Sequence, residues 1–187
     1  MTEVDRDALE RARREALAQR AAEPKAKLPS IEGADPMLRE ALAALGRSPS
    51  PAAHVAVGMA YERLGVTDQA FDHYTDAIRM DRRYAPAWDR RARLWRDWDM
   101  IELALADAHR AVYFAPESGE AHNTLGTILE RAGQCEAALS TYRKALTLAP
   151  EADWARENVE RLEPVCGAGA GGPRPARQRP ECRTTTS

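Results

Sequence analysis

Residues 122–150 read HNTLGTILERAGQCEAALSTYRKALTLAP, and the small and aromatic residues of this stretch recur at earlier places in the chain. The interval between copies is 34 residues. A fixed period of this length is typical of stacked helical arrays, in which no single repeat can bury its apolar face alone. The equivalent positions are Gly58, Tyr61, Gly65, Ala70, Tyr74 and Ala77; Ala92, Trp95, Asp99, Ala104, Ala108 and Ala111; and Gly126, Leu129, Gly133, Ala138, Tyr142 and Ala145.

The composition of the 187-residue chain fits an array of closely packed helices. Apolar residues make up 44% of the chain and aromatic residues 6%, so we expect small side chains at the helix contacts. The net charge of −2 argues against duplex DNA or an anionic membrane as the main partner, because neither polyanion is attracted to the chain as a whole.

The sequence predicts neither a membrane span nor a secretory signal. No segment approaches the roughly 18 to 20 consecutive apolar residues that a spanning helix needs, and the first residues are charged. We therefore expect a cytoplasmic protein, and the excess of Arg over Lys hints at a GC-rich, bacterial genome. Cys135, Cys166 and Cys182 lack metal-ligand spacing, and in a reducing compartment we do not expect them to pair.

Proline, glycine and charge divide the chain into four parts. We expect a charged, solvated helix over 2–22, and the alternative is that this helix docks onto another chain. A linker with helix-breaking prolines follows it. Asp35 and Pro36 predict the start of a short helix, and Pro164 the end of the last one. The expected parts are 1–34; a capping helix or half-repeat over 35–50; repeats 51–84, 85–118 and 119–152 with a capping helix to 163; and a disordered basic tail over 164–187.

The middle repeat departs from the other two. Trp95 stands where they have Tyr61 and Leu129, and Ala108 stands where they have a tyrosine. We expect the volumes of the two helices to be exchanged there, with large side chains on the first helix packing against small ones on the second. The spacing of Asp99 and Glu102 also predicts a capping box at the start of the second helix.

The run from His122 through Gly133 to Pro150 resembles a tetratricopeptide repeat, and the 34-residue period matches that family. The resemblance covers about 51–163. It implies an all-α solenoid, in which three tandem helix-turn-helix repeats form a right-handed superhelix with flanking capping helices. Three positions depart from the pattern: Arg91 replaces an apolar residue, Asp99 the turn glycine, and Arg82 the closing proline of the first repeat.

The resemblance also implies that the first helices line a concave groove that holds a peptide or helix of a partner protein. Arginines dominate the middle of this surface and suit carboxylate recognition, because a guanidinium can donate two parallel hydrogen bonds. The alternative is a solvated charged face in which Asp89 and Asp97 neutralise these arginines. The expected groove residues are Met59, Arg63, Asp89, Arg90, Arg93, Arg96, Asn123 and Thr127.

Members of the family that bind chaperone tails clamp a terminal carboxylate with Lys and Asn at set places on the first helices. The resemblance assigns those places to Val55, Met59, Arg90, Glu120 and Thr124, and the only basic residue among these is Arg90. A chaperone tail is therefore not an expected ligand.

The chemistry-bearing residues do not form a catalytic pattern. His54 and His122 occupy equivalent repeat positions and are interpreted as packing residues, while His73 and His109 lack ligand spacing. We expect no catalytic residue, cofactor or metal. The predicted function is a protein-binding adaptor, with self-association as a further option. The alternative is a binder of single-stranded RNA that uses the groove arginines and the basic tail.

Overall fold

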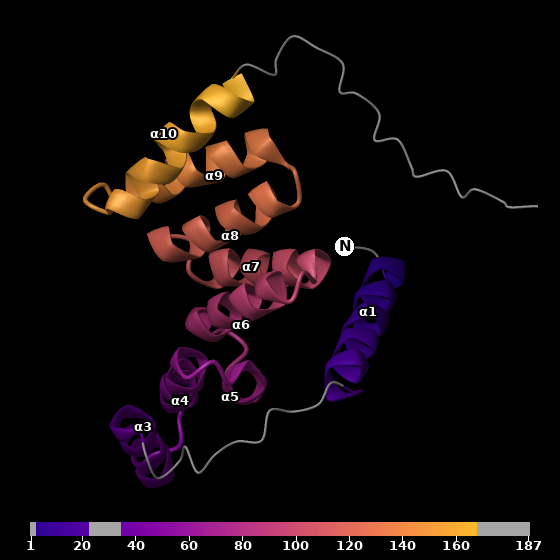
Figure 1. The fold of residues 1–187 in the computed structure, drawn as a ribbon, viewed down its shortest axis with the longest axis vertical. Coiled ribbons are helices and arrows are strands. Elements are labelled where there is room, and N and C mark those ends of the chain that lie inside the picture. Colours follow the sequence, from indigo (N-terminus) through magenta and orange to yellow (C-terminus); the bar gives the residue numbers. More distant parts are fainter. Residues whose placement is uncertain (1–2, 23–34, 168–187) are drawn as a thin grey trace, which may run out of the picture.

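The computed structural model describes residues 3–22 and 35–167, and these ranges fold into nine α-helices (Figure 1). The predicted all-α repeat array is confirmed. No helix in the described ranges is long and apolar enough to cross a membrane. The helices are α1 (Glu3–Ala22), α3 (Pro36–Arg47), α4 (Pro51–Arg63), α5 (Thr67–Met80), α6 (Ala85–Asp97), α7 (Ile101–Phe114), α8 (Gly119–Arg131), α9 (Cys135–Leu148) and α10 (Asp153–Gly167).

Side-chain caps begin three of these helices. Asp35 accepts a hydrogen bond from the Leu38 amide at 2.8 Å, as the Asp-Pro pair predicts. Ser50 and Ser118 cap α4 and α8 in the same way. Each cap satisfies a backbone N–H that the first helical turn leaves without a partner.

The turn inside each helix pair uses one residue in the left-handed backbone region. Gly65 and Gly133 have φ values of 75° and 73°, and Asp99 takes the same place with a φ of 60°. Aspartate tolerates this conformation better than most residues, although less well than glycine. The predicted capping box of Asp99 and Glu102 is wrong, because Asp99 serves as the turn residue and α7 begins only after Met100.

Glycine on the first helix and tyrosine on the second form a tight pair in the outer repeats. A methyl group at Gly126 would lie 2.6 Å from the Tyr142 ring, and Gly58 faces Tyr74 in the same way. Each tyrosine hydroxyl then donates to a glutamate twelve residues before it, Glu130 or Glu62. In the middle repeat these glycines and tyrosines are replaced by Ala92 and Ala108, both fully buried.

The middle repeat is filled instead by Trp95 and a buried ion pair. Arg91 donates to Asp107 through Nε at 2.7 Å and Nη2 at 3.1 Å, and both residues are at most 3% exposed. Arg91 Nη1 reaches Thr75 of the preceding repeat, and the Trp95 indole donates to Asp107. The charged residue that departs from the family pattern therefore links two repeats.

Helix α10 closes the C-terminal end of the stack. Leu162 is buried and Val159 partly buried against α9, whereas Trp154 stays half exposed outside the core. Arg161 pairs with Glu130 of α8 at 2.5 Å. Pro164 does not end this helix, which continues to Gly167, so the predicted tail begins inside a helix; residues 168–187 lie outside the described ranges.

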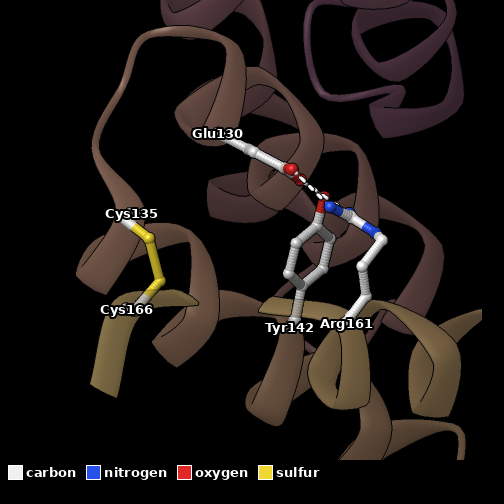
Figure 2. The surroundings of a disulfide bond; sticks show 5 residues. All are labelled: Glu130, Cys135, Tyr142, Arg161 and Cys166. Carbon is white, nitrogen blue, oxygen red and sulfur yellow. Dashed lines mark hydrogen bonds and ion pairs between the residues drawn. A yellow bond between two sulfur atoms is a disulfide. The ribbon is translucent and has the colours of Figure 1, made fainter. Parts of the chain in front are cut away.

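A disulfide joins Cys135 and Cys166, so the prediction that these cysteines stay unpaired is wrong (Figure 2). Cys135 opens α9 and Cys166 lies near the end of α10, where the closing helix returns along its neighbour. The bond and the Arg161–Glu130 pair fasten α10 at two places. Cys182 lies outside the described ranges.

Helix α1 lies beside α5 and α7 (Figure 1). Arg20 donates to Asp68 of α5 at 2.8 Å, and its guanidinium lies 3.8 Å from the ring centre of Trp98. Ala16 is buried. The helix expected to be solvated thus packs on its own array, against the second helices of the first two repeats. The predicted linker lies outside the described ranges.

The Gly126–Tyr142 contact predicts the effect of adding one methyl group. Gly126→Ala should lower the free energy of unfolding by about 1 to 3 kcal/mol, because the ring cannot move without disturbing a packed core. Gly46→Ala in α3 is the matched control, since its new Cβ would meet no atom within 4 Å. This substitution should raise the free energy of unfolding by up to about 1 kcal/mol, because alanine favours a helix more than glycine does. Urea denaturation measures both. Equal effects of the two substitutions would contradict the packing account.

Candidate functional site

The first helices of the three pairs lie next to one another and form one continuous face. Helix α4 contacts α6, and α6 contacts α8. The groove residues expected from the sequence come from these three helices. Met59 and Arg63 lie on α4, four residues including Arg90 on α6, and Asn123 and Thr127 on α8. We call this face the groove.

Three of the expected residues surround one pocket at the N-terminal end of the groove. Met59, Arg63 and Arg90 line a cavity of about 470 Å³ together with Met37 of α3. Met37 is 57% exposed and Met59 41% exposed. Sequence reasoning missed Met37 because it interpreted α3 as a cap. Two exposed methionines beside two arginines can accept an apolar side chain and an acidic group together.

A second set of expected residues forms polar links between α6 and α8. Arg93 Nε donates to the Thr124 hydroxyl and Arg96 Nη1 to the Thr127 hydroxyl, both at 3.2 Å. The acceptor is 31 residues after the arginine in both cases. Asn123 accepts from Asn158 of α10 at 2.9 Å. These side chains hold neighbouring repeats together as well as facing the groove.

Every groove arginine has a carboxylate partner. Arg63 pairs with Asp35 at 2.8 Å, Arg90 with Glu62 at 3.8 Å, Arg93 with Asp89 at 3.1 Å and Arg96 with Asp97 at 2.8 Å. The longest of these pairs, that of Arg90, is the easiest for an incoming carboxylate to replace. A groove neutralised in this way does not favour single-stranded nucleic acid, which needs an unpaired basic track.

Asp89 differs from its expected role as a groove-lining residue, because it is only 7% exposed. Its Oδ2 pairs with Arg93, while Oδ1 lacks a hydrogen-bond partner among the described residues. Burial raises the pKa of the Asp89 carboxyl despite the attraction of Arg93. Asp89 therefore positions Arg93 from below the surface.

The histidines form contacts that serve packing. His122 is buried, and its ring nitrogen lies 2.9 Å from the Pro116 carbonyl oxygen. The two ring Nδ1 atoms of His54 and His73 lie 3.1 Å apart, a contact that the sequence did not predict. Burial, followed by His54, lowers the pKa of His73. Within residues 3–22 and 35–167, no group of His, Cys, Asp or Glu side chains could hold a metal ion.

The helix pair of α8 and α9 matches a known protein family. A model described as tetratricopeptide repeat matches residues 119–151, which span α8 and α9. Residues 119–151 form a tetratricopeptide repeat. The neighbouring helix pairs α4/α5 and α6/α7 have the same turn geometry and extend the array toward the N-terminus. No curated protein matches the sequence.

Several solved structures share this fold at low sequence identity, among them tetratricopeptide (TPR) domains. The first such domain of Spaghetti (RPAP3), bound to the HSP90 peptide SRMEEVD, is 21% identical with a TM-score of 0.60, and the match covers 64% of this chain and 95% of that one. The Arabidopsis OM64 domain is 22% identical with a TM-score of 0.58, covering 62% and 96%. MamA is 18% identical with a TM-score of 0.59, covering 70% and 77%. These likenesses show the fold.

Because the carboxyl of Asp89 is buried, we expect a neutral replacement to raise the free energy of unfolding, by an amount that depends on pH. Because its folded pKa is raised, ionisation is less favourable in the folded chain than in the unfolded one. Asp89→Asn should therefore raise the free energy of unfolding at pH 7. The gain should disappear below the unfolded value of 3.8, where the carboxyl is protonated in both states.

Urea denaturation at pH 7 and at pH 3 measures this difference, with the exposed Asp97→Asn as the matched control. The control should change little at either pH, because an exposed pair contributes less than about 1 kcal/mol. A loss of stability in Asp89→Asn at pH 7 would show that the Arg93 pair outweighs the cost of burial.

Proposed function

We propose that the array is a protein-interaction module that binds a peptide or short helix of a partner protein in the groove, without catalysis. The observation that carries this proposal is the pocket between α3, α4 and α6, where Met37 and Met59 stay exposed beside Arg63 and Arg90. Exposed methionines adapt to differently shaped apolar side chains, which suits a binding surface.

The charges around the pocket favour a ligand that carries an acidic group next to an apolar one. Arg90 is held by Glu62 at 3.8 Å, so a carboxylate that approaches from the groove can take a share of its guanidinium. Exchange of one exposed ion pair for another contributes little net free energy. Most of the affinity therefore has to come from the apolar side chain against the methionines.

Chaperone tails are not the proposed ligand. The RPAP3 domain with the same fold holds the HSP90 peptide SRMEEVD. In this chain Val55, which the family resemblance assigns to the clamp, has no hydrogen-bond donor in its side chain, and Thr124 is only 2% exposed. Neither side chain offers an exposed donor to a terminal carboxylate in the groove.

The proposal also concerns the compartment and the oligomeric state of the protein. Disulfides persist mainly in oxidising compartments, so the Cys135–Cys166 bond weighs against the cytoplasmic location that the sequence predicts. A bacterial source stays a prediction. Self-association stays an option that light scattering of the purified chain decides.

Affinity capture from the source cells, followed by mass spectrometry, tests the groove. The double variant Met59→Glu with Arg90→Glu should lose at least about 80% of the protein that the wild type retains, because it fills the apolar pocket with charge and reverses the cation. Lys144→Glu, on the exposed surface of α9, is the control and should retain it.

The synthetic peptide SRMEEVD provides a second arm and should not bind at micromolar concentration. Equal retention by the wild type and the groove variant would contradict binding in the groove. Tight binding of SRMEEVD would contradict the choice of ligand while leaving the groove as the site.

A further inference from the structure

A second and larger cavity lies on the side of the array formed by the second helices. Helix α1 rests against α5 and α7 at its Arg20 end, and the space between these helices is a cavity of about 1,580 Å³. The groove residues described above do not line it. Six arginines and no acidic residue are among the described residues that line it: Arg13, Arg14, Arg79, Arg82, Arg91 and Arg110.

The arginines of this cavity share few carboxylates, unlike those of the groove. Asp107 accepts from both Arg91 and Arg110, and Asp76 pairs with Arg79. Within the part of the chain that the structure describes, Arg13, Arg14 and Arg82 have no carboxylate at ion-pair distance. Counted over the described residues alone, six arginines contact two carboxylates, an excess of four positive charges.

The positive field is strong enough to act on the arginines themselves. Burial lowers the pKa of Arg13 and the nearby guanidinium of Arg91 lowers it further; the Asp107 carboxylate opposes this shift, and Arg110 and Arg79 add smaller effects that lower the pKa. Like charges held together in this way repel one another, and an anion between them relieves that repulsion.

Apart from Thr75, the other described residues that line the cavity are apolar or aromatic. Leu17 and Ile78 line it from α1 and α5, and Tyr113 and Phe114 from the end of α7. Tyr113 is 78% exposed, with its ring edge-to-face against Phe114 at 5.1 Å between centroids. A large exposed aromatic ring beside unpaired cations fits a ligand that alternates acidic and apolar groups.

The size and the ring contacts favour a peptide over a small molecule or a nucleic acid. The cavity exceeds the roughly 300 to 1,000 Å³ of small-molecule pockets. Trp88 offers little surface to a base, since it is 8% exposed and Arg91 and Arg110 lie 5.0 Å and 4.7 Å from its ring centre. The chain as a whole is acidic, with a net charge of −2, which disfavours a polyanion beyond the cavity.

We propose that this cavity is a second binding site, which takes an acidic segment of a partner protein. Aspartate or glutamate side chains of the segment pair with Arg13, Arg14 and Arg82, and an apolar side chain packs on Tyr113 and Phe114. This site is separate from the groove, so one array holds two protein segments on its two sides.

Fluorescence anisotropy of the full chain with a labelled synthetic peptide, EDFEELDDFEEL, tests the site. The peptide should bind at micromolar concentration, and the double variant Arg14→Glu with Arg82→Glu should weaken binding at least about tenfold, because exposed arginines become repulsive. The matched control, Arg47→Glu with Lys144→Glu, has the same net charge and exposed positions elsewhere, and should change affinity less than about threefold.

Two further arms separate this site from other sources of binding. The groove variant Met59→Glu with Arg90→Glu should bind the acidic peptide as the wild type does, whatever the outcome of the groove experiment. A labelled uridine oligonucleotide should bind more weakly than the peptide. Any of three results would overturn the proposal. The wild type does not bind the peptide, the cavity variant and its matched control lose affinity equally, or the oligonucleotide binds more tightly than the peptide.

Discussion

The buried ion pair of Arg91 and Asp107 is the interaction on which the middle of the array depends. Its two hydrogen bonds, of 2.7 and 3.1 Å, join α6 to α7, and a third from Arg91 to Thr75 reaches α5 of the preceding repeat. The Trp95 indole donates to the same carboxylate. A buried charge is costly unless it is paired and its hydrogen bonds are satisfied, and here both conditions are met.

This pair also decides how charge is distributed over the two sides of the array. Asp107 pairs with both Arg91 and Arg110, so two arginines that line the large cavity share one carboxylate. On the groove side each arginine has its own acidic partner. Arginine therefore has two roles: the groove arginines hold neighbouring elements together, and Arg13, Arg14 and Arg82 beside the large cavity are the ones that we propose to meet a ligand.

Much of the fold follows from the sequence because it depends on spacing. The 34-residue interval predicts the helix pairs, and the small residues predict close helix contacts, which the structure shows at Gly58 against Tyr74 and at Gly126 against Tyr142. Because the repeat occurs three times, the same spacing can be compared between three copies. The turn at Asp99 was found for the same reason, since it takes the backbone conformation of the two equivalent glycines.

The features that the sequence did not reveal depend on contacts outside the repeat pattern. Arg91 stood out as an exception, but its partner Asp107 lies 16 residues away on the next helix and has no sequence signal of its own. The Cys135–Cys166 bond joins a repeat to its capping helix across 31 residues. Predicting the cavity beside α1 would require knowing where this helix packs. Its apolar stripe is thin and does not indicate a particular neighbour.

The sequence predicted which helices form the groove, but it did not predict which groove side chains are accessible to a ligand. Its residues lie on the expected helices, yet Asp89 is buried and Met37 comes from outside the three repeats. Spacing identifies which side chains share a face. It does not report which of them are already paired, and pairing decides what a ligand can reach.

A double-mutant cycle on Arg91 and Asp107, measured by urea denaturation, tests the central claim most directly. Arg91→Met and Asp107→Leu should each cost about 3 to 5 kcal/mol, since each deprives a buried charge of its two-hydrogen-bond partner, while the double variant should lose far less than their sum. The predicted coupling is at least about 2 kcal/mol, against at most about 0.5 kcal/mol for the exposed Asp76–Arg79 pair. A coupling near zero at Arg91 and Asp107 would contradict the account.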